Sequence, residues 1–140
     1  MRLMALDVGE KRIGIATSHG IFASPHSVLR RKSKKEDFAR LRRLIAELEI
    51  ERLIIGMPYS LSAPDGIGPQ ARRIQRYAEA LAPEISIPIE FFDERYSTVD
   101  AQDKLRLAGN KKVPIDAAAA AVILQNYLDS HNSRPKNPLA

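Results

Sequence analysis

Short apolar segments alternate with amphipathic ones along the chain, and their spacing predicts five strands. Residues 2–8 are apolar on both faces, which indicates a buried strand, and residues 12–18 alternate as its hairpin partner would. Residues 21–30 predict a third strand, interrupted near Pro25, because proline supplies no N–H group to a sheet. Two shorter apolar segments predict the remaining strands, at residues 53–56 and 87–93.

Four segments have the apolar spacing that is typical of helices. Between residues 36 and 48 the apolar side chains fall on one stripe, at Phe38, Leu41, Ile45 and Leu48. The other helices are predicted at residues 70–82, 97–108 and 116–129, and the last contains an alanine run that can approach a neighbour closely. Residues 59–69 are rich in turn formers, and a loop of this length inside a compact domain is often functional.

The order of these elements predicts a mixed sheet. The first three strands have short links and should be antiparallel, whereas the later strands are separated by helices and should run parallel to the first. We therefore expect an α/β fold, with a mixed five-stranded sheet flanked by helices. Ligands of such sheets bind at the carboxyl ends of the parallel strands, so candidate chemistry is expected at that edge.

Composition is typical of a single globular domain. The chain has 140 residues, of which 44% are hydrophobic and 28% charged, and it has no cysteine, which excludes disulfides and thiolate zinc sites. We expect one domain over residues 1–130. Residues 131–140 contain prolines among polar neighbours and are predicted to be a disordered tail. No segment has the length and apolarity of a membrane span, so we expect a cytoplasmic protein.

Positive charge is concentrated in three clusters. The net charge is +5, and basic residues recur between Arg30 and Arg43 with only Glu36 and Asp37 to oppose them. The other two clusters are Arg72, Arg73 and Arg76 on a predicted helix, and Lys111 with Lys112. Each cluster alone could be a solvated face, but three in so short a chain favour a partner rich in phosphates. Aromatic residues are few, so stacking of bases is not the expected mode of binding.

Acidic residues are expected to meet at the carboxyl edge of the sheet. Asp7 ends the first strand, Asp93 and Glu94 end the last, and Asp116 begins the final helix. If both strands are central and parallel, these carboxylates are neighbours, and like charges at such distances require cations. Oxygen ligands without histidine or cysteine favour Mg²⁺ or Mn²⁺, and two such ions can clamp the attacking and leaving oxygens of a phosphoryl displacement.

Each of these acids also has a simpler interpretation. Asp7 could bond the amides of its own turn, and Asp116 could cap its helix, which is the commoner use of an aspartate at that position. Asp93 could bond the turn that follows it, and Glu94 could pair with Arg95 or with a basic helix. These interpretations stay open on the spacing alone.

Four motifs follow one another along the chain. They are Leu6 to Gly14 (LDVGEKRIG), then Gly56-Met57-Pro58 with Asp65-Gly66 and Gly68-Pro69-Gln70-Ala71, then Asp93 to Thr98 (DERYST), and finally Ile115-Asp116 with Ala118-Ala119 ahead of Leu124-Gln125 and Tyr127-Leu128. In this order they resemble the motifs of the YqgF family, over about residues 1–130. Members of this family are described as Holliday-junction-resolvase-like proteins and as nucleases that mature the precursor of small-subunit ribosomal RNA.

The resemblance implies a ribonuclease H-like fold and metal-dependent cleavage of phosphodiester bonds in nucleic acid. Asp7, Glu94 and Asp116 would be the catalytic, metal-binding acids, with Asp93 as a fourth catalytic candidate. In the hypothesis that follows, Asp7 bridges two Mg²⁺ or Mn²⁺ ions, while Glu94 and Asp116 each hold one of them.

The resemblance also implies a set of substrate-binding residues. They are Lys11 and Arg12 near the scissile phosphate, Gly56 and Pro58 at the cleft beside the 59–69 loop, and Arg95 and Thr98 in the third motif. The family usually has leucine and threonine where this chain has Tyr96 and Ser97, so substrate contacts at that turn are expected to differ.

The function implied most specifically is maturation of the 5′ end of the small-subunit rRNA precursor. The alternatives are a Holliday junction resolvase in DNA recombination or repair, and a non-catalytic RNA- or ribosome-associated binding module. A sugar-kinase or actin-like ATPase shares the opening motif but needs two such domains, and 140 residues supply one.

The expected partners are nucleic acid, as an rRNA precursor or branched DNA, and ribosomal particles, with no membrane. The sequence leaves a monomer and a homodimer equally open, although symmetric cutting of a junction would require two sites.

Overall fold

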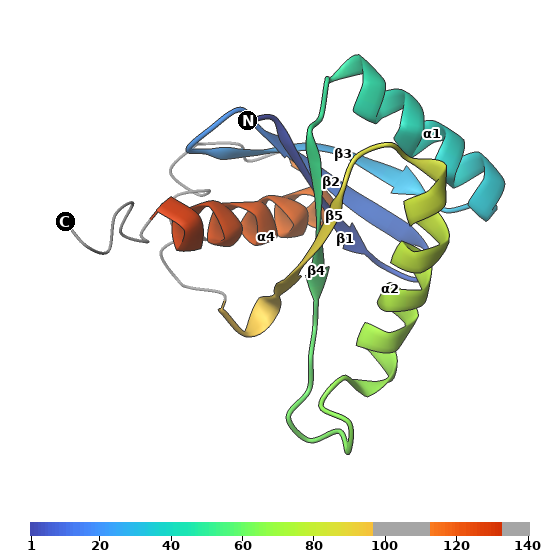
Figure 1. Ribbon diagram of the computed structural model, residues 1–140, viewed down its shortest axis with the longest axis vertical. Coiled ribbons are helices and arrows are strands. Elements are labelled where there is room, and N and C mark those ends of the chain that lie inside the picture. Colours follow the sequence, from blue (N-terminus) through green and yellow to red (C-terminus); the bar gives the residue numbers. More distant parts are fainter. Residues whose placement is uncertain (97–112, 133–140) are drawn as a thin grey trace.

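A five-stranded mixed sheet with helices on both faces forms the protein (Figure 1). The computed structural model describes residues 1–96 and 113–132. The strands are β1 (Leu3–Val8), β2 (Arg12–Ser18), β3 (Ala23–Arg30), β4 (Arg52–Met57) and β5 (Ile89–Asp93), in the spatial order β3-β2-β1-β4-β5. The helices are α1 (Lys34–Glu47), α2 (Gly68–Leu81) and α4 (Ile115–Asn132), with 3₁₀ turns η1 (Ala82–Glu84) and η2 (Glu94–Tyr96).

The directions of the strands confirm the predicted mixed sheet. β1 pairs with β2, and β2 with β3, in antiparallel fashion, whereas β1 with β4 and β4 with β5 are parallel. β3 is continuous, and the interruption predicted near Pro25 is a register shift in its pairing with β2. Ile15 is opposite Ser27, whereas the next residue, Ala16, is opposite Pro25. Because β3 is an edge strand, a residue without an N–H group is tolerated there.

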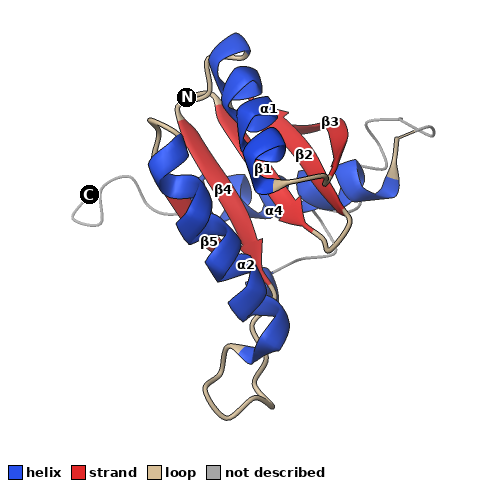
Figure 2. Ribbon diagram, turned by 90° about the vertical axis from the view of Figure 1, so that its right-hand side faces the viewer, coloured by secondary structure: helices blue, strands red, loops and turns tan. Residues whose placement is uncertain are grey.

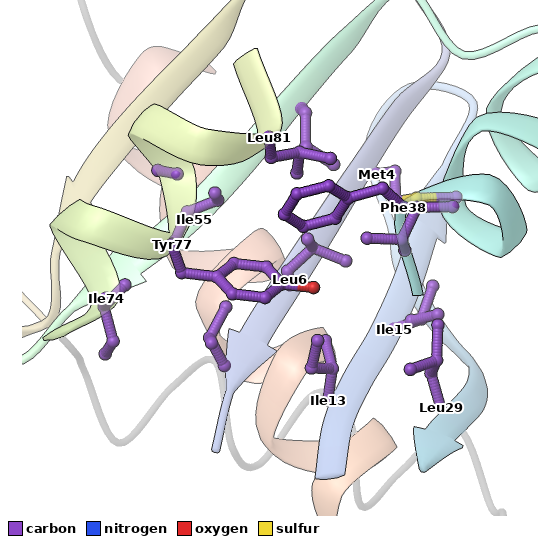
Figure 3. Close-up of a cluster of buried hydrophobic side chains, with 14 of the residues drawn as sticks. Met4, Leu6, Ile13, Ile15, Leu29, Phe38, Ile55, Ile74, Tyr77 and Leu81 are labelled. Atoms are coloured by element: carbon purple, nitrogen blue, oxygen red, sulfur yellow. The ribbon is translucent and has the colours of Figure 1, made fainter. Parts of the chain in front are cut away.

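The two faces of the sheet are covered by different helices. Successive side chains of a strand point to opposite faces, so β1 supplies both sides of the core. Met4, Leu6 and Val8 pack with α1 and α2, whereas Leu3 and Ala5 pack with α4. Figure 2 shows α1 and α2 in front of the sheet and α4 behind it, and Figure 3 shows the side chains of the first cluster.

The helices begin and end close to their predicted limits, for identifiable reasons. Ser33 precedes α1, and its Oγ accepts a hydrogen bond from the backbone N–H of Glu36 at 3.2 Å, which fixes the start of the helix. The alanine run of α4 is buried against the sheet, with Ala120 and Ala121 fully covered, as its small side chains predicted. α4 extends three residues beyond the predicted end at Asp129, so the first residues of the predicted tail are helical.

Some of the features predicted from the sequence fall outside the residues that the structure describes. This applies to the helix predicted at 97–108, to Thr98 and to Lys111 with Lys112. Among the residues that the structure describes, no helix combines the length and apolar character needed to cross a bilayer.

Candidate active site

Carboxylates gather at the carboxyl ends of the parallel strands, but their arrangement differs from the expected one. Asp7 lies near the end of β1, Asp93 is the last residue of β5, and Glu94 opens η2. The expectation that β1 and β5 are both central strands with neighbouring ends is wrong. β4 lies between them, and β5 forms an edge of the sheet, so an acid on β5 must reach across β4 to meet Asp7.

Gly56 makes this reach possible. Ile55 of β4 is opposite Leu6 of β1, which places Gly56 level with Asp7. A Cβ atom built on Gly56 would lie 2.9 Å from Oε1 of Glu94 and 2.6 Å from Cδ1 of Ile123. The carboxyl group of Glu94 therefore occupies the space that a side chain on β4 would fill, on the side of the sheet covered by α4.

Gly14 likewise leaves space that allows the third acid, Asp116, to approach the sheet. It pairs with Asp7 across the β1–β2 hairpin, and a Cβ atom built on it would overlap the backbone carbonyl of Asp116. The first turn of α4 thus lies directly on β2, and this contact carries Asp116 to the edge where Asp7 is found. Gly14 stands within the first motif but was not among the predicted site residues, although a glycine inside a strand pattern indicates a close backbone approach.

Asp7 and Glu94 both have raised pKa values, as expected for acids that lie close together without a positive charge beside them. Burial raises the pKa of Asp7, and the negative charge of Asp116 raises it further. The pKa of Glu94 is also raised by burial, and then by the charges of Asp7 and Asp93. Within residues 1–96 and 113–132, neither of these two carboxyl groups has a hydrogen-bond or ion-pair partner.

Asp116 and Asp93 differ, because each has an arginine partner. Nε of Arg12 donates to Oδ2 of Asp116 at 2.8 Å. Nε of Arg95 donates to Oδ2 of Asp93 at 2.9 Å, and hydrogen bonding from Arg95 holds the pKa of Asp93 below its ordinary value. The expected alternative for Glu94, a pair with Arg95, is thus made by Asp93 instead.

The donor set suits a hard divalent cation. In the described part of the chain, no three histidine, cysteine or carboxylate side chains lie close enough together to form a ready-made metal site. Asp7, Glu94 and Asp116 nevertheless offer only oxygen atoms. Burial and, after it, the repulsion of neighbouring carboxylates raise the pKa of Asp7 and of Glu94, and a cation would offset both effects. Asp116 would have to exchange Arg12 for the cation in order to join the other two.

The remaining candidate residues surround these acids. Lys11 is exposed in the β1–β2 turn, next to Arg12. Pro58 directly follows β4 and is half-buried, and the guanidinium of Arg95 lies 5.6 Å from the ring centroid of Tyr59 in the loop beyond it. The structure therefore brings all the described candidates, from four distant parts of the chain, to one end of the sheet.

Comparison with known proteins identifies a family that the chain matches over most of its length. A family model described as "RuvX: Holliday junction resolvase" matches residues 1–130. A relative from Thermoanaerobacter pseudethanolicus named "Putative pre-16S rRNA nuclease" is 40% identical over 96% of this chain and 100% of its own length. A relative of the same name from Syntrophomonas wolfei is 42% identical over 92% of this chain and 94% of its own length.

Solved structures with the same fold include two resolvases. RuvC from Thermus thermophilus, in complex with a Holliday junction substrate, aligns with a TM-score of 0.66 at 13% identity, over 95% of this chain and 96% of that one. The Fowlpox virus resolvase, in complex with its junction DNA, aligns with a TM-score of 0.54 at 12% identity, over 94% and 99%. At these identities the likeness concerns the fold, and it confirms the ribonuclease H-like architecture that the motifs implied.

Proposed function

The chain belongs to the RuvX (YqgF) family, and from this premise we propose that it is a metal-dependent nuclease that matures the 5′ end of the small-subunit rRNA precursor. One observation carries the proposal. Asp7 and Glu94 are half-buried, their charges repel each other with Gly56 lying between β1 and β5, and neither has a cationic partner among the described residues. A bound cation would offset the cost of holding such a pair of carboxylates partly buried, which supports a metal site here.

The proposed roles follow from the position of each side chain. Asp7, Glu94 and Asp116 would hold Mg²⁺ or Mn²⁺, and the cation would supply Lewis-acid activation of the phosphate and of the attacking water. Arg12 keeps Asp116 oriented in the structure, and once Asp116 turns to a cation, the guanidinium can bind a phosphate oxygen. Lys11 adds positive charge at the same turn, which stabilises the charge that develops on the phosphate during cleavage.

Asp93 has a supporting role in this proposal. Its carboxylate receives four hydrogen bonds from Arg95: Nε donates to both carboxylate oxygens, Nη2 donates to Oδ2, and the backbone N–H donates to Oδ1. We assign it to the orientation of Arg95 beside the substrate path, and we assign metal binding to Glu94.

Two substrates fit the family, and the RNA precursor is the first choice. The relatives that are about 40% identical over nearly their whole length are named for pre-16S rRNA. With that substrate the protein would act on ribosomal particles in the cytoplasm, and a single site, in a monomer or in each subunit of a homodimer, would suffice. The second candidate is a four-way DNA junction, because the family model carries that description and the RuvC neighbour was solved with a junction. Junction cutting would require a homodimer with two sites.

Cleavage of both substrates by wild type and by Asp7→Asn, with Mg²⁺ or Mn²⁺, tests the proposal. We expect wild type to cut the rRNA precursor and Asp7→Asn to lose more than about 100-fold in rate, because one anionic ligand is gone. Glu47→Gln is the matched control, since Glu47 is exposed at the far end of α1. Normal cutting by Asp7→Asn would refute the site. A wild type that binds RNA without cutting it would favour a non-catalytic module.

Metal binding can be followed without any cleavage. Titration of Mn²⁺ should raise the melting temperature of the wild type, because a cation that binds only the folded state stabilises it. Asp7→Asn should show a clearly smaller rise at the same concentrations. An equal rise in both proteins would contradict the assignment of Asp7 as a ligand.

A further inference from the structure

A basic cavity lies on the opposite face of the sheet from the acids. Its volume is about 290 Å³, and it opens between the end of β1, the segment that enters α1, and α2. Four cationic side chains line it, namely Arg31, Lys34, Arg73 and Arg76, together with the single carboxylate of Glu10 and a floor that includes Tyr77. The basic clusters of α1 and α2, far apart in the sequence, thus share one concave surface.

The positive charge of this cavity is largely uncompensated. Arg73 pairs with Glu10 at 3.5 Å, but the side chain of Glu10 is 81% exposed, and such surface pairs contribute little. Among the described residues, Lys34 and Arg76 have no carboxylate within ion-pair distance. Cations that converge on one concave surface raise the local concentration of anions.

One of the cations is held rigidly, which distinguishes the cavity from a solvated face. Nη1 of Arg31 donates to the carbonyl oxygen of Gly9 at 2.8 Å, and its Cζ lies 4.8 Å from the ring centroid of Tyr77. The ring of Tyr77 is buried and also packs edge-on against Phe38, as Figure 3 shows. Because this ring is already covered, it is not available to stack on a base, so the cavity suits a phosphate group rather than a nucleobase.

The cavity and the acids share the end of β1 but face opposite ways. Val8 lines the cavity, whereas Asp7, the residue before it, lies on the α4 side. A nucleic acid that contacts both must turn around the edge of the sheet beside Gly9. Duplex DNA resists such a turn, since its persistence length is about 150 base pairs, whereas a single strand can follow it.

We propose that this cavity binds a backbone phosphate of a single-stranded segment that flanks the scissile bond. The inference rests on the proposed nuclease function and narrows its substrate class to nucleic acids with an unpaired arm beside the cleavage point. The chemistry recognised is a phosphodiester, which RNA and DNA share.

Binding without metal tests the inference independently of cleavage. Fluorescent oligonucleotides with either a single-stranded or a duplex arm would be titrated in EDTA over a range of salt concentrations, in RNA and in DNA form. Lys34→Gln/Arg76→Gln would be compared with Lys35→Gln/Arg43→Gln, which removes the same charge from exposed positions of α1 outside the cavity. All four side chains are exposed, so folding should be unaffected.

We expect the cavity variant to bind the single-stranded arm at least about 5-fold more weakly, and its salt slope to fall by about 0.7 for one lost phosphate contact. Its affinity for the duplex-armed substrate should match that of the control variant. Equal behaviour of the two variants on the single-stranded arm would overturn the proposal, as would equal losses on both substrates. A wild-type protein that never cuts would contradict only the proposed nuclease function. The proposed phosphate binding would still be tested, because the binding comparison requires no cleavage.

Discussion

Asp7 and Glu94 are half-buried carboxyl groups whose raised pKa values have a direct consequence for stability. A carboxyl group with a higher pKa in the folded state binds its proton more tightly there than in the unfolded chain. Its contribution is therefore favourable only at pH values below the unfolded-state pKa, near 4, and it is lost as the pH rises through the folded-state pKa. At neutral pH the charged form of Asp7 works against folding.

Asp7→Asn should accordingly stabilise the protein at pH 7 in the absence of divalent metal, by an amount on the order of 1 kcal/mol. The gain should shrink as the pH approaches 4, where the aspartate of the wild type becomes protonated. Urea unfolding at both pH values measures it, with Glu47→Gln as an exposed control. A variant that is less stable than wild type at pH 7 would show that Asp7 has a structural partner instead.

Tyr77 is a second residue whose side chain departs from the usual pattern. Its hydroxyl group is buried and has no hydrogen-bond partner within the described residues. Burial raises the pKa of this phenol, and the charge of Asp37 raises it further, so the group stays protonated. Such an unpaired hydroxyl costs about 1–3 kcal/mol in desolvation.

Tyr77→Phe is expected to raise the free energy of unfolding by about 1 kcal/mol, since it removes that hydroxyl and leaves the ring in place. The edge contact with Phe38 and the stacking of Arg31 both depend on the ring and should persist. Denaturant unfolding would measure the change, and Tyr77→Leu, which removes the ring, should be destabilised instead. A loss of stability in Tyr77→Phe would reveal a hydrogen bond to water.

At the level of elements, the contact between β2 and the first turn of α4 determines where Asp116 lies. The close approach exists because Gly14 has no side chain, and the clashing atom is a backbone carbonyl, which cannot move aside as a flexible side chain can. The contact near Gly56 differs, since its neighbours are the ends of the Glu94 and Ile123 side chains.

Gly14→Ala should therefore destabilise the fold by about 1–3 kcal/mol and lower activity, because α4 must shift and carry Asp116 with it. Gly20→Ala is the matched control, since a Cβ atom there would have no neighbour within 4 Å, and it should change stability by less than about 0.5 kcal/mol. Thermal unfolding of both variants, with metal-dependent cleavage as a second readout, decides the matter. Equal stability of the two variants would mean that the helix tolerates the displacement.

These elements also show what the sequence could predict. β1 and β2 are adjacent in the chain. The apolar run of residues 2–8, followed after a short link by the alternation of residues 12–18, was sufficient to place them correctly as a hairpin. The position of Glu94 relative to Asp7 could not be predicted from local pattern. It depends on β4 lying between β1 and β5, and on Gly56 leaving space for the Glu94 side chain. The four motifs named the acids, but only the strand order explains how they reach one another.

The basic clusters illustrate the same limit. The clusters at residues 30–43 and 72–76 were visible as charges on, or just before, predicted helices, and a solvated surface was the commoner interpretation of either one alone. Periodicity within a helix does not reveal which other helix lies beside it. That α1 and α2 line one cavity follows from their shared packing on β1, which is a property of the tertiary fold.

At the scale of the whole molecule, the sheet separates two kinds of chemistry. The acids lie on the α4 side of the carboxyl edge, and the basic cavity lies on the side of α1 and α2. On the proposals above, a strand of nucleic acid that follows this edge would be bound by the cations on one face and cleaved by the acids on the other. The two sites would then be separated by about the thickness of the sheet.

The three acids come from residues 7, 94 and 116, and the last of them is delivered by the final helix. Domains emerge from the ribosome amino terminus first, so a nascent chain has its opening strands long before α4 can dock on them. On the proposed function, a nascent chain that has emerged only as far as β5 has two of the three ligands. The set would become complete only when α4 docks on β2, so the docking of one helix would separate a folded sheet from a working nuclease.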